Sequence, residues 1–426
     1  MATSSDAERA AVAVFRIESP RLVAGLARMV RDVGLAEELA QDALVAALET
    51  WPGSGVPENP GAWLMATAKR RAIDVLRRGK LAERKVEELG REASGEAEGP
   101  DLDAALDAPV GDDLLRLVFV ACHPVLSTEG RVALTLRLLG GLTTEEIARA
   151  FLLPEPTIAQ RIVRAKRTLA EARVPFEVPR GAELGARLAS VLQVTYLVFN
   201  EGYAATAGED WVRPALCEDA LRLGRVLAEL APGEPEVHGL VALMEIQASR
   251  LGARVGPSGE PVLLLDQDRT RWDRILIRRG LAALERAESL GALGPYGLQA
   301  AIAACHARAP TAAETDWPGI AALYDALAAL TPSPVVELNR AVAVGMAFGP
   351  AAGLEIANAL LREPLLRAYH LLPSVRGDLL VKLGRLDEAR EELLRAASLA
   401  RNARERGLLL ERAASCDRSR ARPAGA

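Results

Sequence analysis

Apolar residues recur at helical spacing through most of the 426-residue chain. Residues 32–52 place Leu35, Leu39 and Ala43 on one helix face, with acidic side chains on the other. Residues 61–78 repeat this pattern with arginines and a lysine around the polar side. Sustained valine and isoleucine alternation, which would indicate strands, is scarce. We therefore predict an all-α fold, with residues 51–63 as a loop because of their prolines and glycines.

Residues 142–169 predict two short amphipathic helices around a turn that contains Pro154 and Pro156. Thr143 and Glu146 have the spacing of a capping box at the start of the first helix. The second helix is expected to bury its apolar positions and to display polar and basic ones. Such a helix is typical of a DNA-reading helix, and an ordinary helical hairpin is the alternative.

From about residue 181 the chain becomes a series of Ala- and Leu-rich helices separated by Gly and Pro. Residues 335–360 and 371–402 predict helix-turn-helix pairs, and residues 383–399 look like the second half of a tetratricopeptide repeat (TPR). We predict a TPR-like helical array. Its candidate surface for a ligand or partner comprises Asn200, Glu201, Tyr203, Asp266, Asp268, Arg269, Arg271, Trp272, Asn339 and Arg340. For Asp268, capping a helix is the favoured alternative.

The formal net charge of −5 means that any binding of nucleic acid must be local. Residues 69–85 carry eight Lys or Arg against two acids, whereas residues 86–113 carry ten acids against one base. A second basic cluster follows at residues 161–173. This distribution predicts two small basic modules on a flexible acidic linker, an arrangement that can hold two separated sites on one duplex.

Several classes of protein are disfavoured. No apolar run approaches the roughly 18 residues of a membrane span, and no signal peptide precedes the first helix, so we expect a cytoplasmic protein without membrane contact. The four cysteines are scattered, and we predict buried thiols, no metal site and no cofactor. No P-loop or nucleophile elbow is present, which leaves an enzyme using His306, His370 or Glu201 as a weak alternative.

The first module resembles region 2 of extracytoplasmic-function (ECF) sigma factors. The order is "LAEELAQDALVAALETW" followed by "NPGAWLMATAKRRAIDVLRR", and the matched positions are Pro60, Trp63, Leu64, Ala68, Arg71, Asp74, Arg77 and Arg78. The resemblance implies that the first helix binds the clamp helices of the largest RNA polymerase subunit, through Leu35, Glu38, Leu39, Gln41 and Asp42. It also implies that the loop at residues 53–60 and the following helix hold the −10 promoter element, through Asn59, Trp63, Lys69, Arg70, Arg71, Asp74, Arg77 and Arg78. Trp63 is alternatively a core residue.

The second module resembles sigma region 4. The matched positions are Gly141, Leu142, Thr143, Glu146, Ile147, Ala148, Thr157, Arg161, Arg164, Ala165 and Arg167. Leu152 departs from the glycine usual in the turn, which predicts a wider turn. The resemblance implies recognition of the −35 element through Thr143, Thr157, Gln160, Arg161, Arg164, Lys166 and Arg167. The preceding helices would contact the flap of the second largest polymerase subunit.

The whole layout resembles a subgroup of ECF sigma factors with a long helical extension that is thought to regulate the sigma part. The predicted domains are region 2 at residues 1–80, the linker at 81–111, region 4 at 112–179 and the helical extension at 180–426. The expected partners are RNA polymerase core, promoter DNA, the extension itself through intramolecular contacts, and an unidentified protein or ligand signal. A TPR-type DNA-binding scaffold that acts without polymerase is the remaining alternative.

Overall fold

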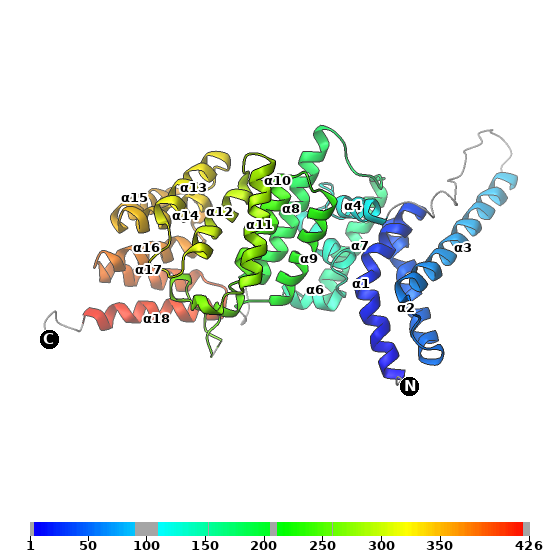
Figure 1. Cartoon of the computed structure of the whole chain (residues 1–426), viewed down its shortest axis with the longest axis horizontal. Coiled ribbons are helices and arrows are strands. Elements are labelled where there is room, and N and C mark those ends of the chain that lie inside the picture. Colours follow the sequence, from blue (N-terminus) through cyan, green and yellow to red (C-terminus); the bar gives the residue numbers. More distant parts are fainter. Residues whose placement is uncertain (1–3, 90–109, 152, 205–210, 258, 421–426) are drawn as a thin grey trace. The chain divides into compact units, whose positions relative to one another are not determined.

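The computed structural model describes residues 4–89, 110–151, 153–204, 211–257 and 259–420. Throughout these ranges the regular elements are helices, and the only strand-like pairing is an isolated bridge between Val255 and Pro261. The prediction of an all-α fold is confirmed. The chain divides into two compact units, residues 1–195 (unit 1) and residues 196–426 (unit 2). Both are drawn in Figure 1. No helix within the described ranges is long and apolar enough to cross a membrane.

Unit 1 contains both predicted modules. Its helices are α1 (Ser4–Val30), α2 (Val33–Ser54), α3 (Pro60–Leu89), α4 (Val110–Ala121), α5 (Thr128–Leu138), α6 (Thr144–Phe151), α7 (Glu155–Glu171) and the first part of α8 (Ala182–Tyr203). Helix α1 packs against α2, α3 and α4, and α7 packs against α5 and α6. Fully buried leucines and isoleucines such as Leu26, Leu64 and Ile158 supply the apolar contacts.

Two predicted loop boundaries are wrong. Helix α2 continues to Ser54, because the fully buried Trp51 anchors its last turn, so the loop before α3 is shorter than residues 51–63. Helix α3 continues to Leu89, into the first residues of the predicted flexible linker. The segment 81–89 is made almost wholly of good helix formers, and this propensity outweighs its charge. The rest of that linker, residues 90–109, lies outside the described residues.

The division between the units lies inside α8, later than the boundary predicted at residues 179 and 180. The first part of α8 belongs to unit 1 because it is bonded to α4. Arg187 donates to the Phe119 carbonyl at 2.9 Å, and the Ser190 hydroxyl donates to the Cys122 carbonyl at 2.7 Å. Both side chains are nearly buried, so these hydrogen bonds satisfy carbonyls at the end of α4 that its own helix cannot.

Unit 2 is a series of helices that pack mostly against the next helix or the next but one along the chain. It begins with the end of α8, and η denotes a 3-10 helix. The further elements are α9 (Pro214–Leu230), α10 (Pro235–Ala248), η1 (Leu251–Ala253), η2 (Leu264–Asp266), η3 (Arg269–Arg271), α11 (Arg274–Leu290), α12 (Pro295–Arg308), α13 (Trp317–Leu330), α14 (Pro334–Phe348), α15 (Pro350–Ala359), η4 (Leu360–Arg362), η5 (Pro364–Leu366), α16 (Leu371–Lys382), α17 (Leu386–Leu399) and α18 (Ala403–Arg420).

The two helix pairs predicted in unit 2 are present as α14 with α15 and α16 with α17. Helices α14 and α15 approach closely where two glycines meet. A Cβ atom on Gly353 would lie 2.5 Å from the Ala341 carbonyl oxygen and 2.8 Å from the Gly345 Cα, which no side chain tolerates. These two glycines lie within their helices and permit the close approach of this pair.

Candidate nucleic-acid and polymerase interface

Helix α7 presents a basic face to solvent. Its apolar residues Ile158, Ile162, Ala165 and Leu169 are buried, as the pattern predicted. The exposed side carries Gln160, Arg164 and Arg167, whereas Thr157 and Arg161 are half-buried. Arg167 pairs with Glu171 at 2.8 Å, on a surface where both side chains are mostly exposed. Arginines so placed can contact phosphates or bases, because their donors face water.

The start of the helix-turn-helix has the predicted capping box. The Glu146 amide donates to Thr143 Oγ1 at 3.1 Å, and Glu146 Oε2 accepts from the Thr143 amide at 2.8 Å. Pro154 precedes the first residue of α7, and Pro156 lies in its first turn, so the two prolines separate the helices as predicted. Leu152 lies outside the described residues, and the expectation of a wider turn stays a prediction.

Helix α3 carries the residues predicted for the −10 element. Asn59 caps it, since Asn59 Oδ1 accepts from the Ala62 amide at 3.1 Å. Trp63 is half-buried and lies edge-on to the buried Trp51, with ring centroids 5.5 Å apart, so it serves packing as well as facing solvent. Of the residues predicted for the −10 element on this helix, Arg70, Asp74, Arg77 and Arg78 are exposed to solvent, while Lys69 and Arg71 are half-buried.

Helix α2 divides the predicted polymerase-binding residues between its surface and the core. Glu38 and Asp42 are exposed, Leu35 and Gln41 are half-buried, and Leu39 is buried. Asp42 is not free, because its carboxylate pairs with Arg71 of α3 at 3.0 Å. The acidic face of α2 therefore carries charge that already contacts the helix predicted to bind DNA.

Glu37 of α2 belongs to the acidic face that the sequence predicted to be exposed, and for this residue the prediction is wrong. Its side chain is 8% exposed, and it pairs with Arg137 of α5 at 2.6 Å and with Lys166 of α7. Gln41 also donates to its carboxylate at 2.8 Å. Burial raises the pKa of Glu37, but the two cations outweigh burial and hold that pKa below its ordinary value. Lys166, predicted for the −35 element, is thus bound to region 2 in this structure.

A second buried carboxylate joins the same two modules. Asp113 of α4 is 2% exposed and pairs with Arg28 of α1 at 3.0 Å and with Arg116 at 2.6 Å. The two modules therefore contact each other in this structure, and the flexible linker stays a prediction because residues 90–109 lie outside the described residues. Within unit 1 the modules are packed together through buried ion pairs.

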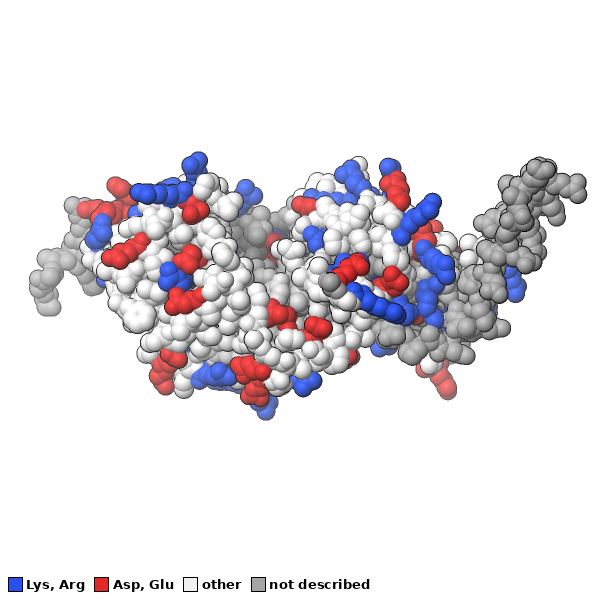
Figure 2. Space-filling model, turned by 90° about the horizontal axis from the view of Figure 1, so that it is seen from above, with Lys and Arg blue, Asp and Glu red and all other residues white. Residues whose placement is uncertain are grey.

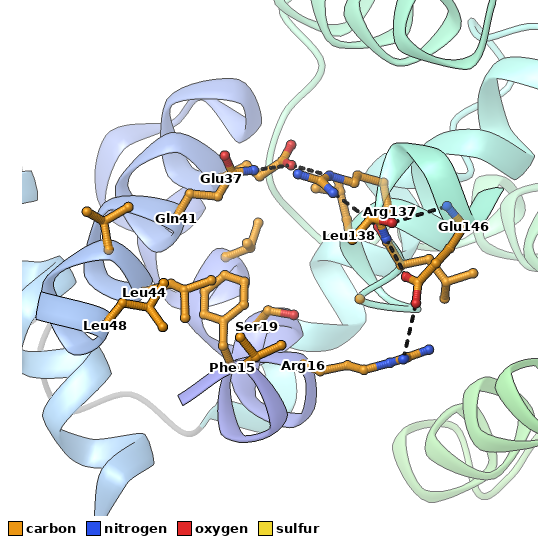
Figure 3. A pocket seen from close by; sticks show the side chains of 16 residues that line it. Phe15, Arg16, Ser19, Glu37, Gln41, Leu44, Leu48, Arg137, Leu138 and Glu146 are labelled. Carbon is orange, nitrogen blue, oxygen red and sulfur yellow. Dashed lines mark hydrogen bonds and ion pairs between the residues drawn. The ribbon is translucent and has the colours of Figure 1, made fainter. Parts of the chain in front are cut away.

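A pocket of about 340 Å³ lies where α1 and α2 meet the α5–α6 segment (Figure 3). Phe15, Leu44 and Leu48 give it an apolar side, and Arg137 and Glu146 give it a charged side. Arg16 spans toward Glu146, with nitrogen and oxygen 3.4 Å apart. The pocket borders Gln41, so the face of α2 predicted to bind polymerase opens beside the contact between the modules.

In unit 2 the predicted surface is largely structural. Asp268 caps η3 by accepting from Thr270 at 2.9 Å, as the favoured alternative predicted. Arg269, Trp272 and Tyr203 are buried rather than exposed. Glu201 pairs with Arg213, and Arg340 pairs with Glu337 and Asp325. The residues of this set that face solvent are Asn200, Asp266, Asp268, Arg271 and Asn339.

Glu201, His370 and His306, which the sequence offered as catalytic groups, each contact a different residue. Glu201 pairs with Arg213, His370 pairs with Glu405 at 2.9 Å, and His306 lies edge-on to Trp317. Cys122, Cys217 and Cys416 are buried thiols, as predicted, whereas Cys305 is half-buried. Within the described ranges, no group of three or more His, Cys, Asp or Glu side chains is placed to hold a metal ion.

Charged side chains are mixed over the surface. On the face shown in Figure 2, lysines and arginines lie interspersed with aspartates and glutamates. A continuous basic band is not visible on this face of the described residues. The mixed charge on this face agrees with the negative net charge, which means that any binding of nucleic acid must be local.

Three family models match the chain in succession. They are sigma-70 region 2 at residues 14–81, sigma-70 region 4 at residues 116–169 and a family of unknown function at residues 187–288. The ECF RNA polymerase sigma factor SigK of Mycobacterium ulcerans is 33% identical over 171 residues, which are 38% of this chain and 85% of the relative. The chain belongs to the ECF sigma factors.

The extension beyond the sigma domains has a relative as well. An uncharacterized protein of Rhizobium meliloti is 45% identical over 390 residues, which are 91% of each chain. A probable ECF sigma factor, SigI of Mycobacterium tuberculosis, is 27% identical over 166 residues, or 39% of this chain and 56% of that protein. As a sigma factor, the protein acts in transcription initiation, and its sigma domains are of the kind that binds RNA polymerase and promoter DNA.

Proposed function

We propose that this ECF sigma factor directs RNA polymerase core to promoters with a defined −10 and −35 element. Helix α2 binds the clamp helices of the largest subunit, α3 and its preceding loop hold the −10 element, and α7 reads the −35 element. Helices α4 and α5 contact the flap of the second largest subunit. The observation that carries the proposal is that α7 buries its apolar face and turns Arg164 and Arg167 to solvent, within the same unit as the exposed acids of α2.

The direct test is transcription in vitro from fragments of the source genome with core polymerase and the full-length protein. Promoter-dependent transcripts that require the protein support the proposal. If the protein binds DNA but never makes transcription promoter-dependent, it acts as a scaffold without polymerase. The DNA sequences upstream of the transcription start sites found in this way would be aligned to define the −10 and −35 elements.

The assignment of α2 can be tested with Asp42→Arg. A positive charge on the acidic face should weaken retention of core polymerase in a pull-down, because the new arginine would repel the basic groups that we expect on the clamp. Asp42→Arg also removes the ion pair with Arg71, so Arg71→Gln serves as the matched control that breaks the same pair and keeps Asp42. Equal retention of Asp42→Arg and the control would refute this docking site.

The assignment of α7 can be tested with Arg161→Ala and Arg164→Ala. Loss of one base contact should cost about 1–3 kcal/mol of discrimination at the −35 element. The control is Arg9→Ala, which removes the same charge from an exposed position of α1. A −35 footprint that is unchanged in both α7 variants, or equally weakened in Arg9→Ala, would contradict this role.

We further propose that unit 2 regulates the sigma domains. The supporting observation is that one helix, α8, runs without interruption from unit 1 into unit 2. Comparing full-length protein with residues 1–195 decides whether the extension inhibits or is required. A cut near Pro179 would remove Arg187 and Ser190 from unit 1 and confuse the result. Circular dichroism must first show that residues 1–195 are folded, and equal transcription by both forms would refute regulation.

A further inference from the structure

Unit 2 contains a group of cationic and aromatic side chains that the sigma function does not use. We call Tyr203, Trp211, Arg250, Arg254 and Trp272 the arginine–aromatic cluster. Tyr203 ends α8, Trp211 precedes α9, Arg250 and Arg254 flank η1, and Trp272 follows η3, so four separate segments bring them together. The sequence grouped Tyr203 with Trp272 but did not point to Trp211, Arg250 or Arg254.

The two arginines share the aromatic rings. The Arg254 guanidinium carbon lies 3.8 Å from the Tyr203 ring centroid and 5.3 Å from that of Trp211. The Arg250 guanidinium carbon lies 5.7 Å from Tyr203 and 5.8 Å from Trp272. Cation–π contacts orient these guanidinium groups but do not neutralise them.

The positive charge of Arg250 is buried without an ion pair in the described part of the chain. Arg250 is 8% exposed, and among the residues that the structure describes no carboxylate pairs with the side chain of Arg250 or Arg254. Burial lowers the pKa of Arg250, and the neighbouring Arg254 adds to this effect against a smaller opposing influence of Tyr203. A buried, unpaired charge is costly, so proteins normally pair it.

Several hydrogen-bond donors of the cluster also lack an acceptor in the described part of the chain. Within the described residues, the Nε atoms of Arg250 and Arg254 and the indole nitrogens of Trp211 and Trp272 are buried without a hydrogen bond. Arg269 beside them is different, because it donates to the carbonyls of His306 and Ala309 at 2.6 Å each. Unsatisfied buried donors are rare in native proteins, and the four in this cluster can be satisfied by an acceptor that binds from outside the chain.

The surroundings favour an anion as that acceptor. His306 is nearly buried, and burial together with the positive charges of Arg250 and Arg269 lowers its pKa to about 4. Burial is the larger cause of this lowering, and the two guanidinium groups add to it because they disfavour a further positive charge beside them. Arg254 and Trp211 are only half-buried, so this side of the cluster is partly exposed to solvent.

We propose that the arginine–aromatic cluster is a binding site for a small oxyanion, a carboxylate or a phosphate group. Arg250 supplies the buried charge, and Arg254 supplies a planar guanidinium that can donate two parallel hydrogen bonds to one oxyanion. The indole nitrogens complete the donor set. The site stands independently of the sigma function, because it lies entirely within unit 2.

The test is thermal unfolding of the full-length protein at constant ionic strength, with sodium chloride exchanged for sodium phosphate in one series and for sodium acetate in another. A ligand that binds only the folded state raises the Tm, by about 3 °C at several times its Kd, and the rise saturates. Saturation with phosphate alone identifies a phosphate site, and saturation with acetate alone identifies a carboxylate site.

Arg250→Met should abolish the saturable rise while keeping the volume of the buried side chain. Arg254→Met is the second variant, in case the first does not fold, and it should weaken the response. The matched control Arg278→Met, at an exposed position of α11, should respond as the wild type does. The proposal is overturned if neither anion gives a saturable shift, or if Arg250→Met and the wild type shift equally.

Discussion

Glu37 in unit 1 and Arg250 in unit 2 are buried to nearly the same degree, at 6% and 8% exposure, yet their surroundings are opposite. Glu37 contacts two cations, Arg137 and Lys166, from two other helices. Arg250 contacts aromatic rings and a second arginine, and no described carboxylate pairs with it. A buried charge that forms ion pairs with other helices, like that of Glu37, holds those helices together. A buried charge that has no ion pair among the described residues, like that of Arg250, is available to a ligand.

The sharpest test of this comparison is Glu37→Gln. The change leaves Arg137 and Lys166 facing a neutral group in a nearly buried site, and breaking a buried ion pair costs about 3 kcal/mol. Chemical denaturation of the full-length protein, followed by hydrogen exchange on peptides of α2 and α7, should show that loss in unit 1. Glu38→Gln, at an exposed neighbour, should change stability by less than about 0.5 kcal/mol. Equal effects of both substitutions would mean that Glu37 does not hold the modules together.

The next test uses pH. The folded state holds the pKa of His306 at about 4, against an ordinary value of 6.5. As the pH falls below 6.5, His306 therefore binds a proton more readily in the unfolded state than in the folded state. Stability of unit 2 should therefore fall by roughly 2 kcal/mol between pH 7 and pH 5. Glu37 affects stability in a different pH range. Its pKa is lowered, so its contribution is present above its ordinary pKa of 4.5 and is lost only as pH falls below that.

Hydrogen exchange at both pH values separates the two regions. Peptides of α12, which contains His306, should lose protection at pH 5, and His306→Gln should remove that dependence. Peptides of unit 1 should lose less protection at pH 5. The histidine of that unit, His123, also has a pKa lowered by burial, but it is only half-buried. A pH dependence of α12 that persists in His306→Gln would show that another group is responsible.

The smallest expected effect is that of Arg250→Met without a binding anion. Replacing an unpaired buried charge with an apolar side chain of similar volume should leave stability within about 1 kcal/mol of the wild type, or raise it. The measurement is denaturation in a chloride buffer, in parallel with Glu37→Gln. A loss as large as that of Glu37→Gln would show that Arg250 has a partner inside the fold and would remove the contrast between the two residues.

The sequence predicted most of the local structure. The capping box at Thr143 and Glu146, the two prolines around the start of α7 and the cap at Asn59 all lie where their spacing placed them. These features succeed because caps and turns depend on residues only a few positions apart. The end of α2 was harder, since its helical state at Pro52 depends on the burial of Trp51.

The site was predicted less completely than the fold. The sequence identified the basic face of α7 and the acidic face of α2, and the roles of their individual residues in binding DNA and polymerase stay predictions. It missed Glu37, since nothing in a local pattern distinguishes it from its exposed neighbour Glu38. It likewise assigned Tyr203, Arg269 and Trp272 to a surface, whereas all three are buried.

By itself, the sequence determined the helices, the order of the sigma regions and the family to which the chain belongs, because these depend on short-range spacing and on motifs. The tertiary structure alone decided which charges meet. Glu37 and Arg137 are 100 residues apart in sequence, and Arg250 meets Tyr203 only through the packing of separate helices. The energy of a buried charge depends on its neighbours in space, which no local pattern contains.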